Sequence, residues 1–96
     1  MKDIALPLVK ARLGISTNVR DEYLSHIVDG VIDELEEVNG LSLNKDSPHQ
    51  LMFVVDLSTW RYQNRDIADG MPRHLQFRLH NMIIKQAGGG SGGENV

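Results

Sequence analysis

Apolar residues recur at helical spacing along most of the chain. The clearest stretch covers about residues 19–39, where apolar positions fall on one half of a helix and mostly acidic positions fill the other. Asn18 is suited to cap the start of this helix, and Gly40 is suited to end it. We therefore expect a long amphipathic helix whose apolar half is core. The apolar positions are Tyr23, Leu24, Ile27, Val28, Val31, Ile32, Leu35 and Val38.

The segments on either side of this helix give weaker signals. Pro7 suits a first helical turn and Gly14 suits a C-terminal stop, which together predict a short helix over about residues 7–13. Residues 39–46 show only a brief alternation of apolar and polar positions. We expect a loop there, with at most a short extended segment.

The second half of the chain predicts two more helices. Ser47 and Gln50 fit a capping box, and Pro48 takes the first helical position, so a helix is expected from there to about Asn64. A fourth helix is expected over residues 71–87, with Leu75, Leu79, Met82 and Ile83 on one side.

Taken together, these patterns predict an all-α fold, a small bundle of about four helices with a flexible glycine-rich C-terminal tail. The expected helical domain covers residues 1–87, and the tail covers residues 88–96. Residues 88–93 read Gly-Gly-Gly-Ser-Gly-Gly, which is linker composition with nothing to bury. An engineered linker has the same composition, and that alternative stays open.

The third and fourth helices are apolar on two faces. Phe53, Leu57 and Trp60 lie nearly opposite the other apolar face of the third helix, and Phe77 and Ile84 lie opposite that of the fourth. Such a helix is either central to its bundle or covered by another subunit. A domain this small can hardly bury every one of these faces, so we expect a subunit interface. The alternative, that the residues of the third helix are simply core, stays open.

Composition narrows the class of protein. The chain has 96 residues, of which 41% are hydrophobic, so it is one small globular domain. The absence of cysteine excludes disulfides and thiolate zinc sites. No secretory core and no run of about 18 apolar residues is found, so we expect a soluble protein made in a cytoplasm, with no membrane contact. A net charge of −3 argues against tight DNA binding.

Charge is unevenly distributed over the predicted helices. The polar half of the helix over residues 19–39 is acidic, whereas His74, Arg78 and Lys85 form a basic stripe on the fourth helix. One interpretation of the acidic half is a solvated face. The other is an electrostatic surface that meets a basic neighbour or faces an anionic polymer that must not adhere. The acidic stripe is Asp29, Asp33, Glu36 and Glu37.

Catalytic and metal-binding patterns find little support. None of the four histidines pairs with a carboxylate or another histidine at a known ligand spacing. The glycines at 88–93 follow a helix and lack the Lys-Ser/Thr pair of a phosphate-binding loop. We therefore expect no enzyme, no metal site and no cofactor.

Several blocks of the sequence resemble a known family. They lie at residues 8–15, 20–24, 56–65 and 71–81, and the more specific ones contain Trp60-Arg61-Tyr62 and Met-Pro-x-x-Leu-x-x-Arg-Leu from residue 71. In these blocks the chain resembles the head–tail connector (adaptor) proteins of tailed phages, of the Gram-positive siphophage type. The resemblance spans most of residues 7–84.

This resemblance implies a structural virion protein without catalytic residues. Members are small helical proteins that form a ring, usually dodecameric, beneath the portal protein. The ring continues the channel through which genomic DNA passes without sequence-specific binding, and offers a docking surface to a downstream stopper, head-completion or tail protein. The resemblance thus implies a location in the virion neck, after assembly in the cytoplasm of the host bacterium.

Residue patterns and resemblance together suggest three surfaces. A ring needs two different surfaces per subunit that fit head to tail. We expect the acidic stripe to face the channel, where it would repel DNA phosphates, although a basic neighbour is the alternative. We expect Gly88, Gly89, Gly90, Ser91, Gly92 and Gly93 to contact the portal or a neighbouring subunit. The candidate interface residues are Phe53, Leu57, Trp60, Arg61, His74, Phe77, Arg78, Ile84 and Lys85.

A second interpretation is a small helical DNA-packaging or DNA-binding factor. It would use the arginines and the lysine of the second half, which carries a slight excess of positive charge. These are Arg61, Arg65, Arg73, Arg78 and Lys85.

Overall fold

The computed structural model describes residues 1–65 and 70–87, and all of the secondary structure in these ranges is helical. The predicted all-α fold with four helices is confirmed. The second helix continues directly into a wider π-helical turn, labelled η1. The elements are α1 Lys2–Leu13, α2 Asp21–Asp33, η1 Glu34–Val38, α3 Pro48–Gln63 and α4 Arg73–Ala87.

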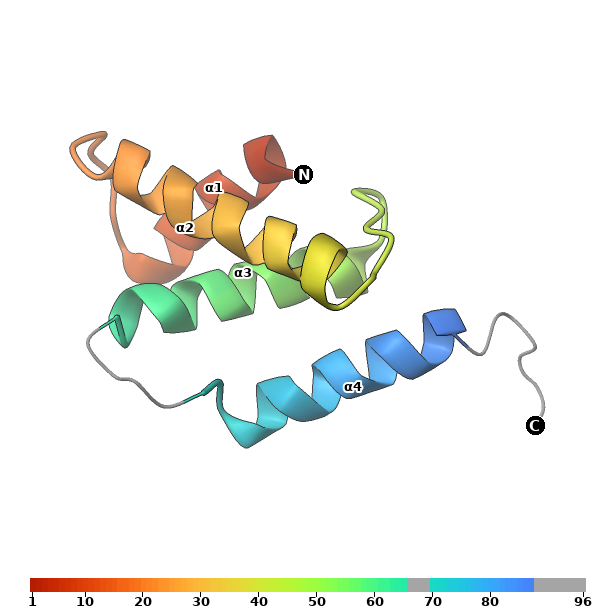
Figure 1. The fold of residues 1–96 in the computed structure, drawn as a ribbon. Helices are drawn as coiled ribbons and strands as arrows, with labels where there is room; N and C mark the ends of the chain where they lie inside the picture. The colour runs from red at the N-terminus through yellow and green to blue at the C-terminus, as the bar shows by residue number, and fades with distance from the viewer. Residues whose placement is uncertain (66–69, 88–96) are drawn as a thin grey trace.

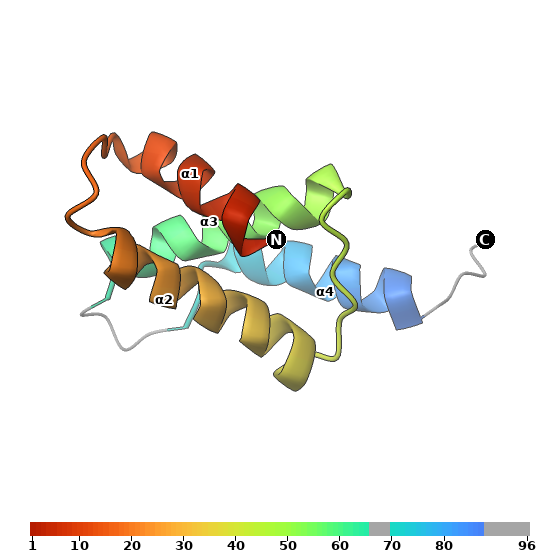
Figure 2. The same cartoon turned by 90° about the horizontal axis from the view of Figure 1, so that it is seen from above.

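Helix α3 is the centre of the structure. α1 and α2 pack against each other and against α3, whereas α4 lies along the opposite side of α3 and contacts no other helix (Figure 1). Seen from above, the loop over residues 39–46 crosses from the end of α2 to the start of α3 (Figure 2). Because α3 is covered from both sides, it can carry two apolar faces within a single chain.

The core is built from the apolar faces of all four helices and one loop residue. It is widest around α3, where both of the predicted apolar faces are buried. The buried residues are Ala5, Val9, Leu24, Val28, Val31, Leu35, Leu41, Phe53, Val54, Val55, Leu57, Tyr62 and Leu75.

Local signals in the sequence explain several helix ends. Gly14 adopts φ 72°, its N–H donates to Ala11, and the N–H of Ile15 donates to the carbonyl of Lys10, which is a Schellman ending. Gly40 adopts φ 71° just after η1. Ser47 caps α3 by accepting a hydrogen bond from the N–H of Gln50, and Pro48 opens that helix. These predictions are confirmed.

The expected start of the first helix was wrong. α1 begins at Lys2, so Pro7 lies inside the helix and not in its first turn. Starting earlier places Ala5 one turn before Val9, and both side chains are fully buried. The hydrogen bond that Pro7 cannot donate falls on the exposed Asp3, whose carbonyl lies at the helix start.

Two predicted side-chain caps were also wrong. The Asn18 side chain accepts a hydrogen bond from Lys10 at 3.2 Å, and α2 begins three residues later without a side-chain cap. The Gln50 side chain does not complete a capping box with Ser47. Its amide instead accepts from the backbone of Asn44 and donates to the backbone of Ser42, which holds the preceding loop against α3.

The apolar half of α2 is core only in part. Leu24, Val28 and Val31 are buried, but the Tyr23 side chain is half exposed and Val38 is 75% exposed. Val38 leaves the core face because η1 is wound more widely, as the hydrogen bond from the N–H of Asn39 to the carbonyl of Glu34 shows. A helical period of 3.6 residues no longer applies across this turn.

Candidate assembly surfaces

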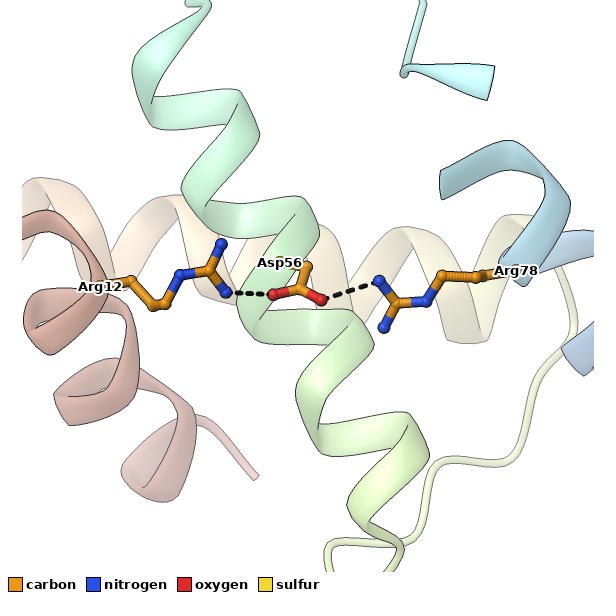
Figure 3. A network of polar contacts seen from close by, with 3 residues as sticks. All are labelled: Arg12, Asp56 and Arg78. Atoms are coloured by element: carbon orange, nitrogen blue, oxygen red, sulfur yellow. Dashed lines mark hydrogen bonds and ion pairs between the residues drawn. The ribbon is translucent and has the colours of Figure 1, made fainter. Parts of the chain in front are cut away.

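A carboxylate on α3 connects α4 to the rest of the chain. Arg78 on α4 donates to Asp56 at 2.7 Å, and Arg12 on α1 pairs with the other oxygen of the same carboxylate (Figure 3). The Asp56 side chain is only 21% exposed. Burial disfavours its charged form, but the hydrogen bonds from Arg78 and Arg12 outweigh burial and hold the pKa of Asp56 below its ordinary value of 3.8.

The inner face of α4 makes few apolar contacts. Leu75 is its one fully buried side chain, while Leu79, Met82 and Ile83 are partly buried against the core. At the far end of α4, the side-chain amide of Gln86 accepts from the N–H of Ser42 and donates to its carbonyl, at 2.8 and 2.9 Å. The helix is therefore held by one fully buried side chain, three partly buried ones and two polar attachments.

A pocket of about 430 Å³ opens between the first half of α3 and the second half of α4. The residues that line it include His49 from α3 and the basic residues Arg78 and Lys85 from α4. The sequence did not point to this pocket, because it depends on how α4 lies along α3.

The candidate interface residues divide into two sets. Phe53 and Leu57 are fully buried within the chain, and Trp60 is partly buried. The guanidinium of Arg78 lies 5.3 Å from the centre of the Phe53 ring. Phe53 and Leu57 are therefore core residues, as the alternative interpretation expected. Their side chains have no exposed surface that another copy of the chain could contact.

The second set lies on α4, where Phe77 and Ile84 face solvent and Lys85 lies at the edge that borders the pocket. The side chains of Phe77 and Ile84 are 66% and 53% exposed. His74 and Lys85 are exposed beside them, whereas Arg61 on α3 pairs with Glu34 at 2.8 Å. The outer face of α4 is thus an apolar centre with a basic border, and α4 contains no acidic residue.

All four carboxylates of the acidic stripe are exposed, on α2 and η1. Asp29, Asp33 and Glu36 line a shallow hollow together with Gly30. Lys2 contacts Asp29 at 3.4 Å, at the margin of the stripe. α2, which forms most of the helix that carries the stripe, lies on the opposite side of α3 from α4 (Figure 1).

The basic residues proposed for DNA binding are largely occupied within the chain. Arg61 pairs with Glu34, Arg78 pairs with Asp56, and Arg65 donates to the carbonyl of Tyr62 at 2.7 Å. Only Arg73 and Lys85 of that group remain on the exposed surface of α4 without a described ion pair. Contacts within the chain therefore take up much of the positive charge that the DNA-binding interpretation needs.

Sequence reasoning missed a cluster around Tyr62. Arg20 bonds to its hydroxyl, the guanidinium of Arg65 lies 5.0 Å from its ring centre, and the Tyr23 ring lies 6.0 Å away. The cluster ties the loop before α2 to the end of α3. Its members come from two stretches about 40 residues apart, 20–23 and 62–65, so the sequence does not show that they meet.

Two further observations concern the described residues only. No group of three or more histidine or acidic side chains there could hold a metal ion. None of the helices in those ranges has the length and apolar character needed to cross a bilayer. The tail predicted to contact a partner, residues 88–96, lies outside the described residues.

One of the comparisons with known proteins identifies a family. The family model described as phage gp6-like head–tail connector protein matches residues 3–82. No curated protein and no solved structure matches the chain.

Proposed function

Because the chain belongs to the phage gp6-like head–tail connector family, we propose that it forms a ring beneath the portal of a tailed phage. The family is structural, and its membership makes this protein a phage connector and a virion component. The observation that carries the proposal is the match over residues 3–82, which includes every described helix except the last turn of α4. The finer assignment to the Gram-positive siphophage type is part of the proposal, and it rests on the sequence blocks that include Trp60-Arg61-Tyr62 and Met-Pro-x-x-Leu-x-x-Arg-Leu from residue 71.

Association into a ring is supported by the two-sided surface of the chain. An apolar and basic surface lies on α4, and an acidic surface lies on α2 and η1, on opposite sides of α3. Closed head-to-tail assembly needs two different surfaces of this kind on each subunit. The ring, proposed to hold twelve subunits, would present one end to the portal and the other to a stopper, head-completion or tail protein.

The acidic stripe is proposed to line the DNA channel. Its carboxylates are exposed, and only Asp29 has a described lysine contact. A negative wall repels phosphates and lets a duplex slide without adhering. A ring structure that places Asp33 and Glu36 on the outer rim would contradict this assignment.

The glycine-rich tail is proposed to contact the portal or a neighbouring subunit. The support is its composition and its position directly after α4, since a backbone without side chains can extend along another protein surface. Deleting residues 88–96 should weaken attachment to purified portal in a pull-down. Unchanged attachment would remove this part of the proposal.

Electron microscopy tests the central claim. Negative-stain images of the purified full chain, with and without portal protein, should show rings in at least the sample with portal. A parallel mobility-shift assay at about 150 mM salt should show no specific duplex binding. Specific binding without rings would instead favour the DNA-binding interpretation.

A further inference from the structure

We propose that the outer face of α4 on one subunit docks against Val38 and the acidic end of α2–η1 on a second copy of this chain. The proposal rests on the ring described above and names the contact that closes it. Three observations support it. Each surface has an exposed apolar residue, the charged residues around the two surfaces are opposite in sign, and a π-helical turn exposes the apolar residue of the second surface.

The first surface is the outer face of α4. Phe77 and Ile84 are seven residues apart, so they lie on one side of the helix, two turns from each other. Both side chains are more than half exposed. Arg73, His74 and Lys85 are exposed along the same helix, which has no acidic residue. A partner for this face needs an apolar centre and negative charge around it.

The second surface is the end of α2 where it becomes η1. A regular helix would place Val38 on the core side, with Leu35 and Val31, because these residues are three or four positions apart. The π-helical turn moves Val38 outward, to 75% exposure, at the end of η1 and just before the loop over residues 39–46. Glu36 and Glu37 are exposed beside it in sequence. π-Turns are uncommon, and they occur frequently at functional sites.

The two surfaces match in chemistry. One offers apolar side chains bordered by positive charge, and the other offers an apolar side chain bordered by carboxylates, so contact removes apolar area from water and pairs opposite charges. A single chain cannot make this contact, because α4 turns its opposite face, with Leu75, to its own α3. The contact therefore joins different copies.

The arrangement is head to tail and not two-fold. Each copy uses α4 toward one neighbour and η1 toward the other, which is the heterologous pattern that closes a ring. This contact takes Glu36 and Glu37 of the acidic stripe to the seam between two subunits and leaves Asp29 and Asp33 to face the channel.

The absence of cysteine from the chain permits a clean cross-linking test. We would make Val38→Cys, Phe77→Cys and the double variant, and treat each with a short bis-maleimide. Both positions are exposed, so the fold should be kept, and circular dichroism checks this. Cysteine is itself a small apolar side chain, so the substituted contact is weakened but still forms for the cross-linker to trap. The double variant should give a ladder of covalent oligomers. A mixture of the two single variants should give covalent dimers, and neither single variant alone should cross-link.

A matched control places one cysteine elsewhere. Val19 is 87% exposed in the loop between α1 and α2, away from both surfaces, so Val19→Cys combined with Phe77→Cys should give no ladder. A ladder from this control equal to that of the first pair would overturn the proposal. Cross-linked dimers from Val38→Cys alone would also overturn it, because they indicate a two-fold contact.

A second experiment introduces a charge at the apolar centre of the α4 surface and measures ring yield. Phe77→Asp should reduce ring yield by at least about tenfold, since it places an unpaired charge in the contact. Leu8→Asp, at an exposed apolar position on α1, should leave ring yield unchanged. Rings that form without the Val38–Phe77 cross-link would end this inference and leave the proposed function intact. The absence of any oligomer, with or without portal, would end both.

Discussion

Two regions of the molecule are built in different ways. In the unit of α1, α2 and α3, each helix packs against both of the others and contributes fully buried apolar side chains. Among the helices, α4 packs only against α3. It buries Leu75 completely and Leu79, Met82 and Ile83 in part, and polar contacts attach it to Asp56 and Ser42. Segments with few buried apolar contacts open most easily. The first region therefore supplies most of the stability of the chain, and α4 carries the surface that we propose for assembly.

The largest expected difference in stability is between substitutions of two phenylalanines, Phe53 and Phe77. The helical pattern alone gave both as candidate interface residues. Phe53→Ala removes a ring with no exposed surface and should lower the free energy of unfolding by about 3–5 kcal/mol. Phe77→Ala, at a 66% exposed position, should change it by less than about 0.5 kcal/mol. Urea denaturation followed by circular dichroism measures both. Equal losses would show that α4 buries Phe77 in the isolated chain.

The anchor of α4 provides the next test. Leu75→Ala should weaken the docking of α4 by about 2–3 kcal/mol, because the buried side chain leaves a cavity against α3. Amide hydrogen exchange should accelerate by roughly 30-fold or more within α4 and much less within α1–α3. Leu79→Ala, at a partly buried position, is the milder control. Equal acceleration in all four helices would mean that α4 and the core unfold as one unit.

Removing the charge of Asp56, which links the two regions, should have an intermediate effect on the free energy of unfolding. Asp56→Asn removes the charge that Arg12 and Arg78 share, at a site that is only partly exposed, and should cost about 1–2 kcal/mol. The paired change Arg12→Gln should affect α1 more than α4. Denaturation combined with hydrogen exchange separates the global loss from the release of α4.

The same carboxylate gives a pH dependence of known sign. The pKa of Asp56 is lowered in the folded chain, so its contribution to stability is complete above the ordinary value of 3.8. It is lost as the pH falls from that value through the lowered pKa. The difference in unfolding free energy between the wild type and Asp56→Asn should therefore shrink as the pH is lowered below about 4. A difference that stays constant down to pH 2 would show that the pairing with arginine does not act through charge.

The sequence predicted the fold where short-range chemistry decides it. Gly14 ends α1 because a positive φ is easy for glycine, and Ser47 with Pro48 starts α3 because cap and first-turn geometry are local. Pro7 misled the prediction, since burial of Ala5 extends α1 beyond the proline. Val38 was misplaced because a π-turn changes the helical period without a sequence signal.

The candidate surfaces were predictable only in part. The sequence showed that α3 and α4 are each apolar on two sides, but not which sides the chain itself would cover. Contacts between distant segments decide that question: α4 covers the face of Phe53 and leaves Phe77 exposed. The acidic stripe was correctly expected to be a polar face of α2, yet its partner stays a prediction.

The smallest expected effect concerns the far end of α4. The Gln86 amide makes two hydrogen bonds with the backbone of Ser42, so Gln86→Ala should release the last turn of α4 at a cost of about 0.5–1 kcal/mol. Because both groups are exposed, water replaces the lost bonds and global stability should hardly change. Faster amide exchange confined to residues 83–87 measures the effect, and Gln63→Ala, at an exposed position on α3, is the control. If exchange at the end of α4 is unchanged, the apolar contacts of Met82 and Ile83 hold this end without the Gln86–Ser42 hydrogen bonds. The two regions would then differ less in how firmly their helices are packed than the polar attachments of α4 suggest.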